Sequence, residues 1–384
     1  DATIVKKLRE AGADFVCKAS MDELGMGGTN KNAYTGVVHN PYDLDRIPGG
    51  SSGGCAALVA AGCVPLAIGT DTGDSVRKPA AYCGVVGVKP TYGRISRYGI
   101  IPYASSLDHV GYFTTNVKDA ALALEVLAGR DDHDMTSSYE VVGEYSKLLN
   151  SDLTNKTIGV FKTVIDEVEN KELKAQFNAL VSKLEEKGAK IVEVEMPKEY
   201  MELIAPVYKT IANAEATANH SNLDGIRFGM REDGQDLEEV MTNTRTKGFS
   251  SYVRARFVIG SYSLFEENQD RLFRKAQKIR RLIVQAYAKM FEECDAVLSV
   301  AAPTIAPLIN ESSDVRFGVS SFAEEHMQLQ NFSGYPSITL PLGKVDSMPV
   351  AVNLTCKPFE EQKMFDVSSA IEECTGLKGQ CLEG

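Results

Sequence analysis

The stretch 47-IPGGSSGGCAALVAAGCVPLAIGTDTGDSVRKPAAYCG-84 determines the fold class of this chain. Glycine and serine dominate its start, apolar runs occupy residues 55–61 and 64–69, and the polar turn TDTGDS follows. The interleaved apolar runs argue against a flexible Gly/Ser linker. The first run has the small-residue texture of a buried helix, and the second has that of a buried strand.

The chain on the carboxyl-terminal side of this stretch alternates between strand and helix patterns. Residues 117–127 predict a helix that Thr115 or Asn116 caps, with Gly129 just past its end. The segments TIGVF, 171–187 and KIVEVEMP predict a strand–helix–strand unit. This alternation favours an α/β fold with a largely buried sheet.

Two further segments extend this pattern towards the ends of the chain. A long charged helix over residues 269–293 leads into DAVLSVAAPT, which predicts a buried strand. At the amino terminus, Ile4 and Leu8 have helical spacing, and residues 15–17 predict a short strand. Because the chain starts directly inside structure, we expect that an upstream segment is missing. The 384 residues are expected to form a single domain, incomplete at its amino-terminal end.

Composition narrows the functional class. The net charge of −11 argues against a general phosphate-binding surface. No apolar run reaches 18 residues and no basic start precedes an apolar stretch, so we expect a soluble, cytoplasmic protein with no membrane partner. The eight cysteines are scattered without a CxxC, and the five histidines form no HExxH. We therefore expect buried free cysteines and no metal site.

Two short serine motifs suggest alternative hydrolase mechanisms. Ser51 and Ser52 each fit the GxSxG nucleophile elbow, but that elbow follows an apolar strand and here the polar segment DLDRIP precedes it. Ser75 and Lys78 fit SxxK, in which the lysine serves as base. This pattern is short and lacks its usual SDN and KTG companions, so it stays an alternative.

The glycine-rich turn itself has the composition of an acyl-transfer site. Glycine lets main-chain N–H groups approach a substrate, and such groups stabilise an oxyanion. Thr72, Gly73 and Asp74 present these N–H groups, and Ser75 at the end of the turn is the candidate nucleophile. Ser51 can relay a proton because a hydroxyl both donates and accepts, and a buried neutral lysine would complete the set.

At this point the sequence resembles a known family. The segments PGGSSGGCAALVAAG, GTDTGDSVRKPAAYCGVVGVKPTYGR and SLDHVG are similar to the amidase signature family, which hydrolyses amides with a Ser–Ser–Lys triad containing one cis-peptide serine. The two serines of the family lie 24 residues apart, as Ser51 and Ser75 do. The resemblance implies that Ser75 forms the acyl-enzyme and Ser51 relays protons. It also implies a large mixed β-sheet core flanked by helices on both faces.

Further segments resemble one branch of that family, the A subunits of tRNA-dependent amidotransferases. They are MDELGMGGTNKN, NPYDLDRIPGGSSGG, RISRYGIIPYASSLDHVG, IANAEATANHSNLDGIRFG, RKAQKIRRLI and NFSGYPSITLP. In that branch the A subunit releases ammonia from glutamine, the B subunit uses ATP and Mg to amidate Glu-tRNA(Gln) or Asp-tRNA(Asn), and a small C subunit joins the two. The resemblance implies no cofactor in this chain and contact with tRNA only through the B subunit.

The same resemblance assigns substrate-binding residues. Arg256 matches the arginine that binds the α-carboxylate of glutamine, and Tyr208 matches its tyrosine neighbour. Glu324 is the nearest match to the acid that holds the amino group. Gly27 and Gly28 are expected to line the pocket with main chain.

Three residues beside the serines are expected to have structural roles. Asp71 and Arg77 flank the nucleophile turn and are predicted to form an ion pair that holds it, and Ser52 is expected to support the site. The sequence departs from the family pattern at Asp74, where the family usually has glycine and where a negative charge would oppose an oxyanion.

The second departure concerns the catalytic lysine. In the family it precedes the segment matching DATIVKKL, so it is absent from this chain, and Lys18 lies in a segment that matches elsewhere. The 384 residues alone are therefore expected to be nearly inactive. Three hypotheses stay open, which are the glutaminase component of an amidotransferase, a stand-alone amidase acting on another small amide, and an inactive scaffold or fragment.

Overall fold

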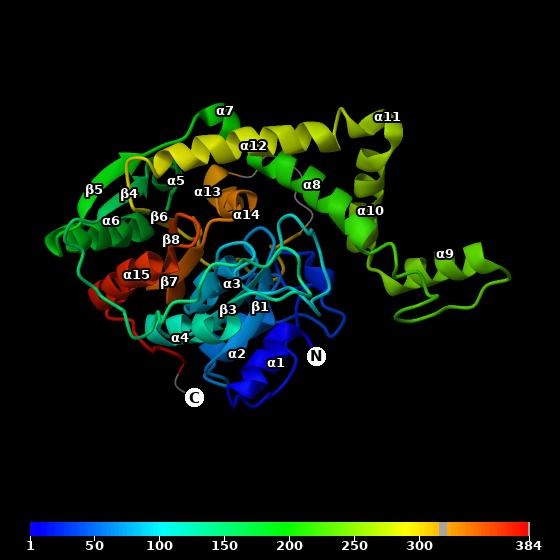
Figure 1. The fold of residues 1–384 in the computed structure, drawn as a ribbon, viewed down its shortest axis with the longest axis horizontal. Helices are drawn as coiled ribbons and strands as arrows, with labels where there is room; N and C mark the ends of the chain where they lie inside the picture. Colours follow the sequence, from blue (N-terminus) through cyan, green and yellow to red (C-terminus); the bar gives the residue numbers. More distant parts are fainter. Residues whose placement is uncertain (315–320, 383–384) are drawn as a thin grey trace.

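An eight-stranded mixed sheet forms the centre of the protein (Figure 1). A computed structural model describes residues 1–314 and 321–382. The strand order is β1-β3-β2-β7-β8-β6-β4-β5. The strands are β1 (Ala67–Asp71), β2 (Val86–Lys89), β3 (His109–Thr114), β4 (Thr157–Phe161), β5 (Lys190–Val194), β6 (Ala296–Val300), β7 (Ser337–Val345) and β8 (Met348–Cys356).

The sheet is antiparallel over most of its width and parallel at one edge. From β1 to β6 every neighbouring pair is antiparallel. At the other edge, β4 runs parallel to both β6 and β5, with Ile158 opposite Ile191. The helix α6 (Lys171–Glu186) connects β4 to β5, as the predicted strand–helix–strand unit requires.

Helices cover both faces of the sheet, so the predicted mixed sheet with flanking helices is confirmed. One face carries α4 (Val117–Leu127), α6 and α15 (Glu361–Thr375), with α1 (Thr3–Glu10) against α4. The other face carries α2 (Gly53–Ala60) and α3 (Arg77–Cys83). The remaining helices are α5 (Lys162–Asp166), α7 (Lys198–Met201), α8 (Ile204–Asn219), α9 (Leu237–Gly248), α10 (Ser251–Leu264), α11 (Glu266–Gln269), α12 (Phe273–Met290), α13 (Phe322–Glu325) and α14 (Gln328–Ser333).

Local sequence chemistry explains where the best-predicted helices begin and which face they bury. Asn116 caps α4 as expected, because its side chain accepts a hydrogen bond of 2.9 Å from the Asp119 N–H. Asn170 caps α6 in the same way. The buried residues of α6 recur at helical spacing and pack against the sheet, namely Leu173, Phe177, Leu180 and Leu184.

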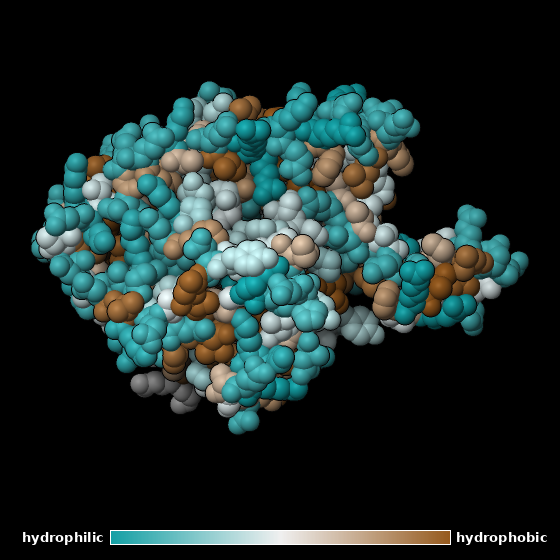
Figure 2. All heavy atoms as spheres, viewed as in Figure 1, coloured by the Kyte–Doolittle hydropathy of each residue, from teal (hydrophilic) through white to brown (hydrophobic). Residues whose placement is uncertain are grey.

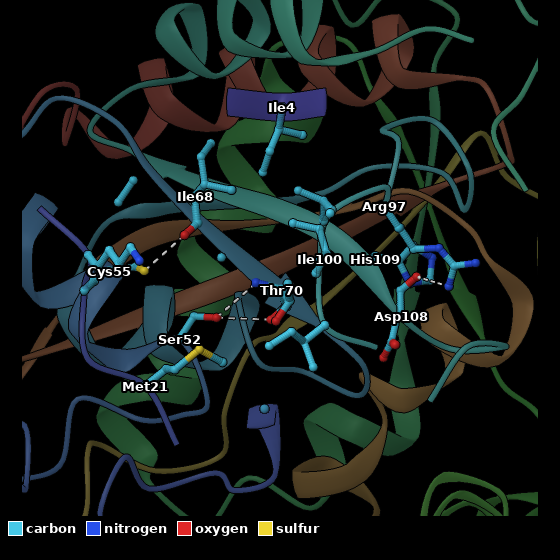
Figure 3. A pocket seen from close by; sticks show the side chains of 18 of the residues that line it. Ile4, Met21, Ser52, Cys55, Ile68, Thr70, Arg97, Ile100, Asp108 and His109 are labelled. Atoms are coloured by element: carbon cyan, nitrogen blue, oxygen red, sulfur yellow. Dashed lines mark hydrogen bonds between the residues drawn. The ribbon is translucent and has the colours of Figure 1, made fainter. Parts of the chain in front are cut away.

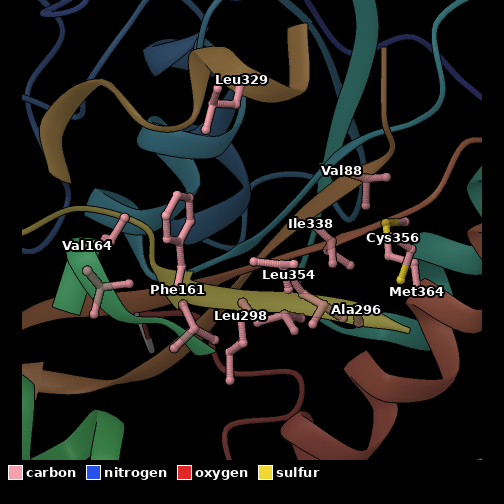
Figure 4. Close-up of a cluster of buried hydrophobic side chains, with 14 of the residues drawn as sticks. Val88, Phe161, Val164, Ala296, Leu298, Leu329, Ile338, Leu354, Cys356 and Met364 are labelled. Carbon is pink, nitrogen blue, oxygen red and sulfur yellow. The ribbon is translucent and has the colours of Figure 1, made fainter. Parts of the chain in front are cut away.

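One large cluster of buried apolar side chains forms most of the core between the sheet and its helices, and a smaller separate cluster lies around α2 and α3 (Figure 4). Leu298 on β6 and Leu354 on β8 face each other across the strand pair, with Ile338 on β7 and Met364 on α15 beside them. Burial of each such side chain stabilises the fold by about 1.5–3 kcal/mol. This rigid scaffold fixes the carboxyl end of β1, where the TDTGDS turn begins.

The helices α8, α10 and α12 pack together beyond the sheet, and a segment carrying α9 projects from them as an arm (Figure 1). Hydrophilic residues dominate the molecular face in Figure 2, and apolar side chains gather on this arm. Its exposed apolar residues are Ile226, Phe228, Met230 and Leu237. None of the described helices combines the length and apolar character that crossing a bilayer requires.

Three sequence expectations need correction. Residues 15–17 form no strand, because they pair with no strand among the described residues, and Phe15 and Val16 are 49% and 73% exposed. The long charged helix predicted over residues 269–293 is present as α12, but it is shorter at both ends, since it spans Phe273–Met290. Only four of the eight free cysteines are buried, which are Cys55, Cys83, Cys294 and Cys356.

Candidate active site

The TDTGDS turn leaves the carboxyl end of β1 and enters α3, with Ser75 almost fully buried between them. In the part of the chain that the structure describes, the N–H groups of Gly73, Asp74 and Ser75 donate to no protein acceptor. Three successive unpaired N–H groups beside a hydroxyl match the requirements of an oxyanion hole next to its nucleophile.

A buried ion pair holds this turn. Arg77 Nη2 lies 2.9 Å from Asp71 Oδ1, and neither side chain is exposed. Arg77 also donates to the Gly73 carbonyl at 2.8 Å, and the Val76 N–H donates to Asp71 Oδ2 at 3.0 Å. Burial alone would raise the pKa of Asp71, but the Arg77 guanidinium outweighs it and holds that pKa well below its usual range. The expected ion pair is therefore present and ties both ends of the turn.

Residues near the carboxyl end of the chain complete this network. Asn331 accepts from Arg77 at 2.7 Å and donates to Asp71 Oδ1 at 2.9 Å. Gln330 and the Met327 carbonyl each accept from Arg77 at 2.9 Å. Asn331 belongs to the segment NFSGYP, so the sequence resemblance marked the region without assigning this role.

We expect Arg77→Met to lower the free energy of unfolding by about 3–5 kcal/mol, because it leaves the Asp71 carboxylate buried and unpaired. Urea unfolding of the two proteins measures this difference. The matched control is Arg274→Ala, whose partner Asp270 is 83% exposed and whose ion pair should contribute less than about 1 kcal/mol. Equal losses for the two variants would contradict a holding role for Arg77.

The segment with the other two serines adjoins the nucleophile. The Ser52 N–H donates to the Ser75 carbonyl at 3.1 Å, and Ser52 Oγ bonds to the main chain of Thr70 on β1 (Figure 3). The peptide bond between Gly50 and Ser51 is cis. Ser51 Oγ is buried and has no hydrogen-bond partner within residues 1–314 and 321–382, so its donor and acceptor positions are both open.

A buried carboxylate packs against this segment. An added Cβ at Gly50 would lie 2.2 Å from Asp22 Oδ2, so only glycine fits there. Asp22 accepts from the N–H groups of Asn30 and Asn32 at 2.9 and 3.1 Å. Burial, helped by the nearby Asp314 carboxylate, raises the pKa of Asp22 to about 7. Asp22 lies in the segment MDELGMGGTNKN, but it was not predicted as a site residue.

The glycines expected to line the pocket lie beside this carboxylate. An added Cβ at Gly27 would meet the Asp22 side chain at 2.3 Å. The Gly28 N–H donates to Asp314 Oδ1 at 2.7 Å, and Thr29 donates to Oδ2 at 2.6 Å. The N–H of Gly28 is therefore already engaged within the protein.

Arg256 and Tyr208, which are far apart in sequence, come together near the turn. The Tyr208 hydroxyl lies 2.9 Å from the position of a Cβ added to Gly73. Arg256 donates to the hydroxyls of Tyr103 and Tyr252, and the centre of the Tyr252 ring lies 4.7 Å from the guanidinium carbon. Burial raises the pKa of Tyr208 well above its usual value, which keeps its hydroxyl a neutral donor.

Tyr103 connects this cationic group to the start of the turn. Its N–H donates to Asp108 Oδ2 at 2.8 Å, and Thr72 Oγ1 donates to Asp108 Oδ1 at 2.8 Å. Burial raises the pKa of Asp108 to about 6. Tyr103 and Asp108 both lie in the segment RISRYGIIPYASSLDHVG, and Tyr252 lies one helical turn before Arg256, but none of the three was predicted as a site residue.

The unusual residue of the turn, Asp74, has a partner. Lys78 Nζ lies 2.5 Å from Asp74 Oδ2 and also donates to the Glu324 carbonyl at 3.1 Å. Burial alone would lower the pKa of Lys78, but the Asp74 carboxylate outweighs it and raises that pKa. A charged lysine with two acceptors is no base for Ser75, which disfavours the SxxK alternative.

A large apolar cavity of about 1320 Å³ adjoins the site (Figure 3). Its walls come from residues 13–25, β1 and residues 97–105, and Ser52, Thr72 and Asp108 reach it. Cys55 on its wall donates to the Ile68 carbonyl at 3.1 Å. In the described ranges, no three His, Cys, Asp or Glu side chains are placed to hold a metal ion.

A family model and several known proteins match this chain. The family model described as Amidase matches residues 1–365. The chain is 43% identical over 378 residues to the A subunit of the glutamyl-tRNA(Gln) amidotransferase of Fusobacterium nucleatum, covering 98% of this chain and 77% of that protein. It is 41% identical over 377 residues to the protein of the same name in Coxiella burnetii, with the same coverage of 98% and 77%.

Solved structures of an amidotransferase A subunit and of an amidase have the same fold as this chain. The A subunit of the glutamyl-tRNA(Gln) amidotransferase of Thermotoga maritima superposes with a TM-score of 0.81 at 34% identity, covering 97% of this chain and 76% of that one. A peptide amidase from Stenotrophomonas maltophilia superposes with a TM-score of 0.80 at 26% identity, covering 98% and 77%. Both sequence and fold similarity therefore extend along nearly the whole chain.

Proposed function

This chain belongs to the amidase family, and from that premise we propose that it is the glutamine-hydrolysing A subunit of a tRNA-dependent amidotransferase. The names of the two relatives from Fusobacterium nucleatum and Coxiella burnetii support this function over that of a stand-alone amidase. The observation that carries the chemistry is the position of Ser75 beside three N–H groups that are unpaired within the described residues. Arg256, held by tyrosines, supplies a cation for an amino-acid substrate.

In this proposal Ser75 Oγ attacks the carbon of the glutamine side-chain amide. Its proton passes to Ser51, and from there to the lysine that the family resemblance implies. The N–H groups of Gly73, Asp74 and Ser75 stabilise the oxyanion that forms on the amide oxygen. The amide nitrogen then takes a proton back through Ser51 and leaves as ammonia. Water attacks the Ser75 ester, which releases glutamate and restores the hydroxyl.

Substrate selection rests on the groups around the turn. The Arg256 guanidinium binds the α-carboxylate of glutamine, because a planar fork of donors matches a carboxylate at two points. Tyr208, whose hydroxyl lies close to Gly73, orients the substrate. The Glu324 carboxylate holds the α-amino group of glutamine, and the main-chain carbonyl of the same residue accepts a hydrogen bond from Lys78. Gly27 and Gly28 border this region through their main chain.

The ammonia released from glutamine is the substrate of a partner subunit. In this proposal the B subunit takes it up, consumes ATP with Mg and amidates Glu-tRNA(Gln) or Asp-tRNA(Asn), while the C subunit joins the two in a cytoplasmic heterotrimer. This chain binds no cofactor and contacts tRNA only through the B subunit. The net charge of −11 agrees with a protein that does not itself bind nucleic acid.

The test is to co-express the full gene product with its B and C partners and to measure ammonia release from glutamine. We expect hydrolysis that rises in the presence of the B partner, and transfer of the amide nitrogen to Glu-tRNA(Gln) or Asp-tRNA(Asn) when ATP is supplied. Isotopically labelled glutamine follows that nitrogen. Equal hydrolysis of glutamine and of simple amides without any partner would instead favour a stand-alone amidase, and hydrolysis of neither would favour an inactive scaffold.

A further inference from the structure

We propose that Lys78 is a positioning residue for the reaction, because it neutralises the Asp74 carboxylate and holds it away from the oxyanion N–H groups. The inference rests on the proposed function of the turn and adds to it a residue that acts through another. Ser75 would attack and the Asp74 N–H would stabilise charge as before. The new element is the ion pair that makes an aspartate tolerable at this position.

The problem that this pair solves is electrostatic. The N–H of Asp74 is one of the three unpaired donors of the described turn, so the carboxylate of the same residue lies close to the developing negative charge. Like charges repel strongly in a partly water-excluded site, because the effective dielectric constant there is far below that of water. The Asp74 side chain is only 21% exposed, so solvent screens it poorly. An unpaired carboxylate would therefore weaken the oxyanion hole.

Lys78 is placed to remove that penalty. Its Nζ lies 2.5 Å from Asp74 Oδ2, and its side chain is only 14% exposed. The Lys78 N–H also donates to the Asp74 carbonyl at 2.8 Å, so main chain and side chain both join the two residues across one helical turn. The pair thus draws the carboxylate towards α3.

A second contact fixes the ammonium group. Lys78 Nζ donates to the Glu324 carbonyl on α13 at 3.1 Å. This bond comes from an element 246 residues further along the chain, so the position of the ammonium group does not depend on the turn alone. Lys78 is therefore an anchored countercharge, and its contacts are with Asp74 and Glu324 rather than with the Ser75 hydroxyl.

The experiment is a double-mutant cycle in the complete complex. We expect Lys78→Met to lower kcat for glutamine about 10- to 100-fold with KM changed less than about threefold, because the uncompensated Asp74 charge acts mainly on the transition state. Asp74→Asn removes the carboxylate charge, so it should lower kcat far less than Lys78→Met does. The variant Asp74→Asn/Lys78→Met should regain kcat to within about fivefold of wild type. Lys78→Arg keeps the countercharge and should stay within about fivefold.

The matched control is Lys363→Met. Lys363 is 23% exposed and pairs with Asp295 and Glu360 at 3.0 Å, outside the candidate site. Its loss should leave kcat and KM unchanged. If Lys78→Met does not fold, as thermal unfolding would show, the same cycle with Lys78→Gln replaces it.

Three results would overturn the inference. A double variant as inactive as Lys78→Met would make Lys78 a base or a structural tether. A rise in KM alone would make the pair part of substrate binding, and a kcat for Lys78→Met within about twofold of wild type would remove any role. If the wild-type complex releases no ammonia from glutamine, the proposed function fails instead, and the cycle is then measured on a simple amide.

Discussion

Replacing Ser75 with alanine is expected to reduce glutamine hydrolysis by at least about 10⁴-fold, because it removes the atom that forms the acyl-enzyme. The loss should appear in kcat, while binding of glutamine stays near its wild-type strength. Amidation of tRNA driven by added ammonium should persist, since that reaction needs no glutamine cleavage in this chain. Ammonia release and tRNA amidation, measured on the same preparation, separate the two activities.

The ammonium-driven reaction is also the control for folding. A Ser75→Ala protein that still supports it has kept its fold and its partners. Hydrolysis of glutamine at the wild-type rate by this variant would show that another residue is the nucleophile. The oxyanion N–H groups and the relay from Ser51 would then lose their assigned roles as well.

Replacing Arg256 with alanine should lower kcat/KM for glutamine about 30- to 5,000-fold, mainly through KM, because a desolvated charge pair that loses one side costs about 2–5 kcal/mol and each 1.36 kcal/mol is about a factor of ten. An amide without an α-carboxylate should lose little. Arg256→Lys should recover glutamine hydrolysis only in part, because an ammonium group cannot make the planar two-point contact.

The matched control for this experiment lies two residues away. Arg254 is exposed on the same helix α10, so Arg254→Ala should leave both substrates unaffected. The measurement is kcat/KM for glutamine and for a carboxylate-free amide in all variants. Equal losses on the two amides in Arg256→Ala would mean that the arginine stabilises the tyrosine cluster rather than binding the substrate.

Features set by neighbouring residues were predictable from the sequence. The cap at Asn116 and the helix that follows it depend on contacts within one turn, and both are confirmed. The strand–helix–strand unit follows from periodicity alone. Residues 15–17 also predict a short strand, yet they form none, because a strand needs a partner and partners are not visible in local sequence.

The candidate site shows the same limit more sharply. The spacing of Asp74 and Lys78 is visible in the sequence, but the SxxK pattern predicts that Lys78 is a base for Ser75. The structure pairs its ammonium group with the Asp74 carboxylate instead. Tyr103 and Arg256 are separated by 153 residues, so no local pattern could join them. Family resemblance supplied Arg256 and Tyr208, but not Tyr103 and Tyr252, whose hydroxyls accept hydrogen bonds from Arg256.

The long reach of the Arg77 network has a consequence for the order of assembly during translation. Its guanidinium finds acceptors 250 to 254 residues downstream, at Met327, Gln330 and Asn331. A ribosome adding about 5–20 residues per second needs about 10–50 s to cover that distance. Throughout that interval the Asp71–Arg77 pair of the nascent chain lacks these three acceptors. Contacts of such high sequence separation also form slowly. The network that holds the TDTGDS turn is therefore complete only after Asn331, the first residue of the segment NFSGYP, has been made.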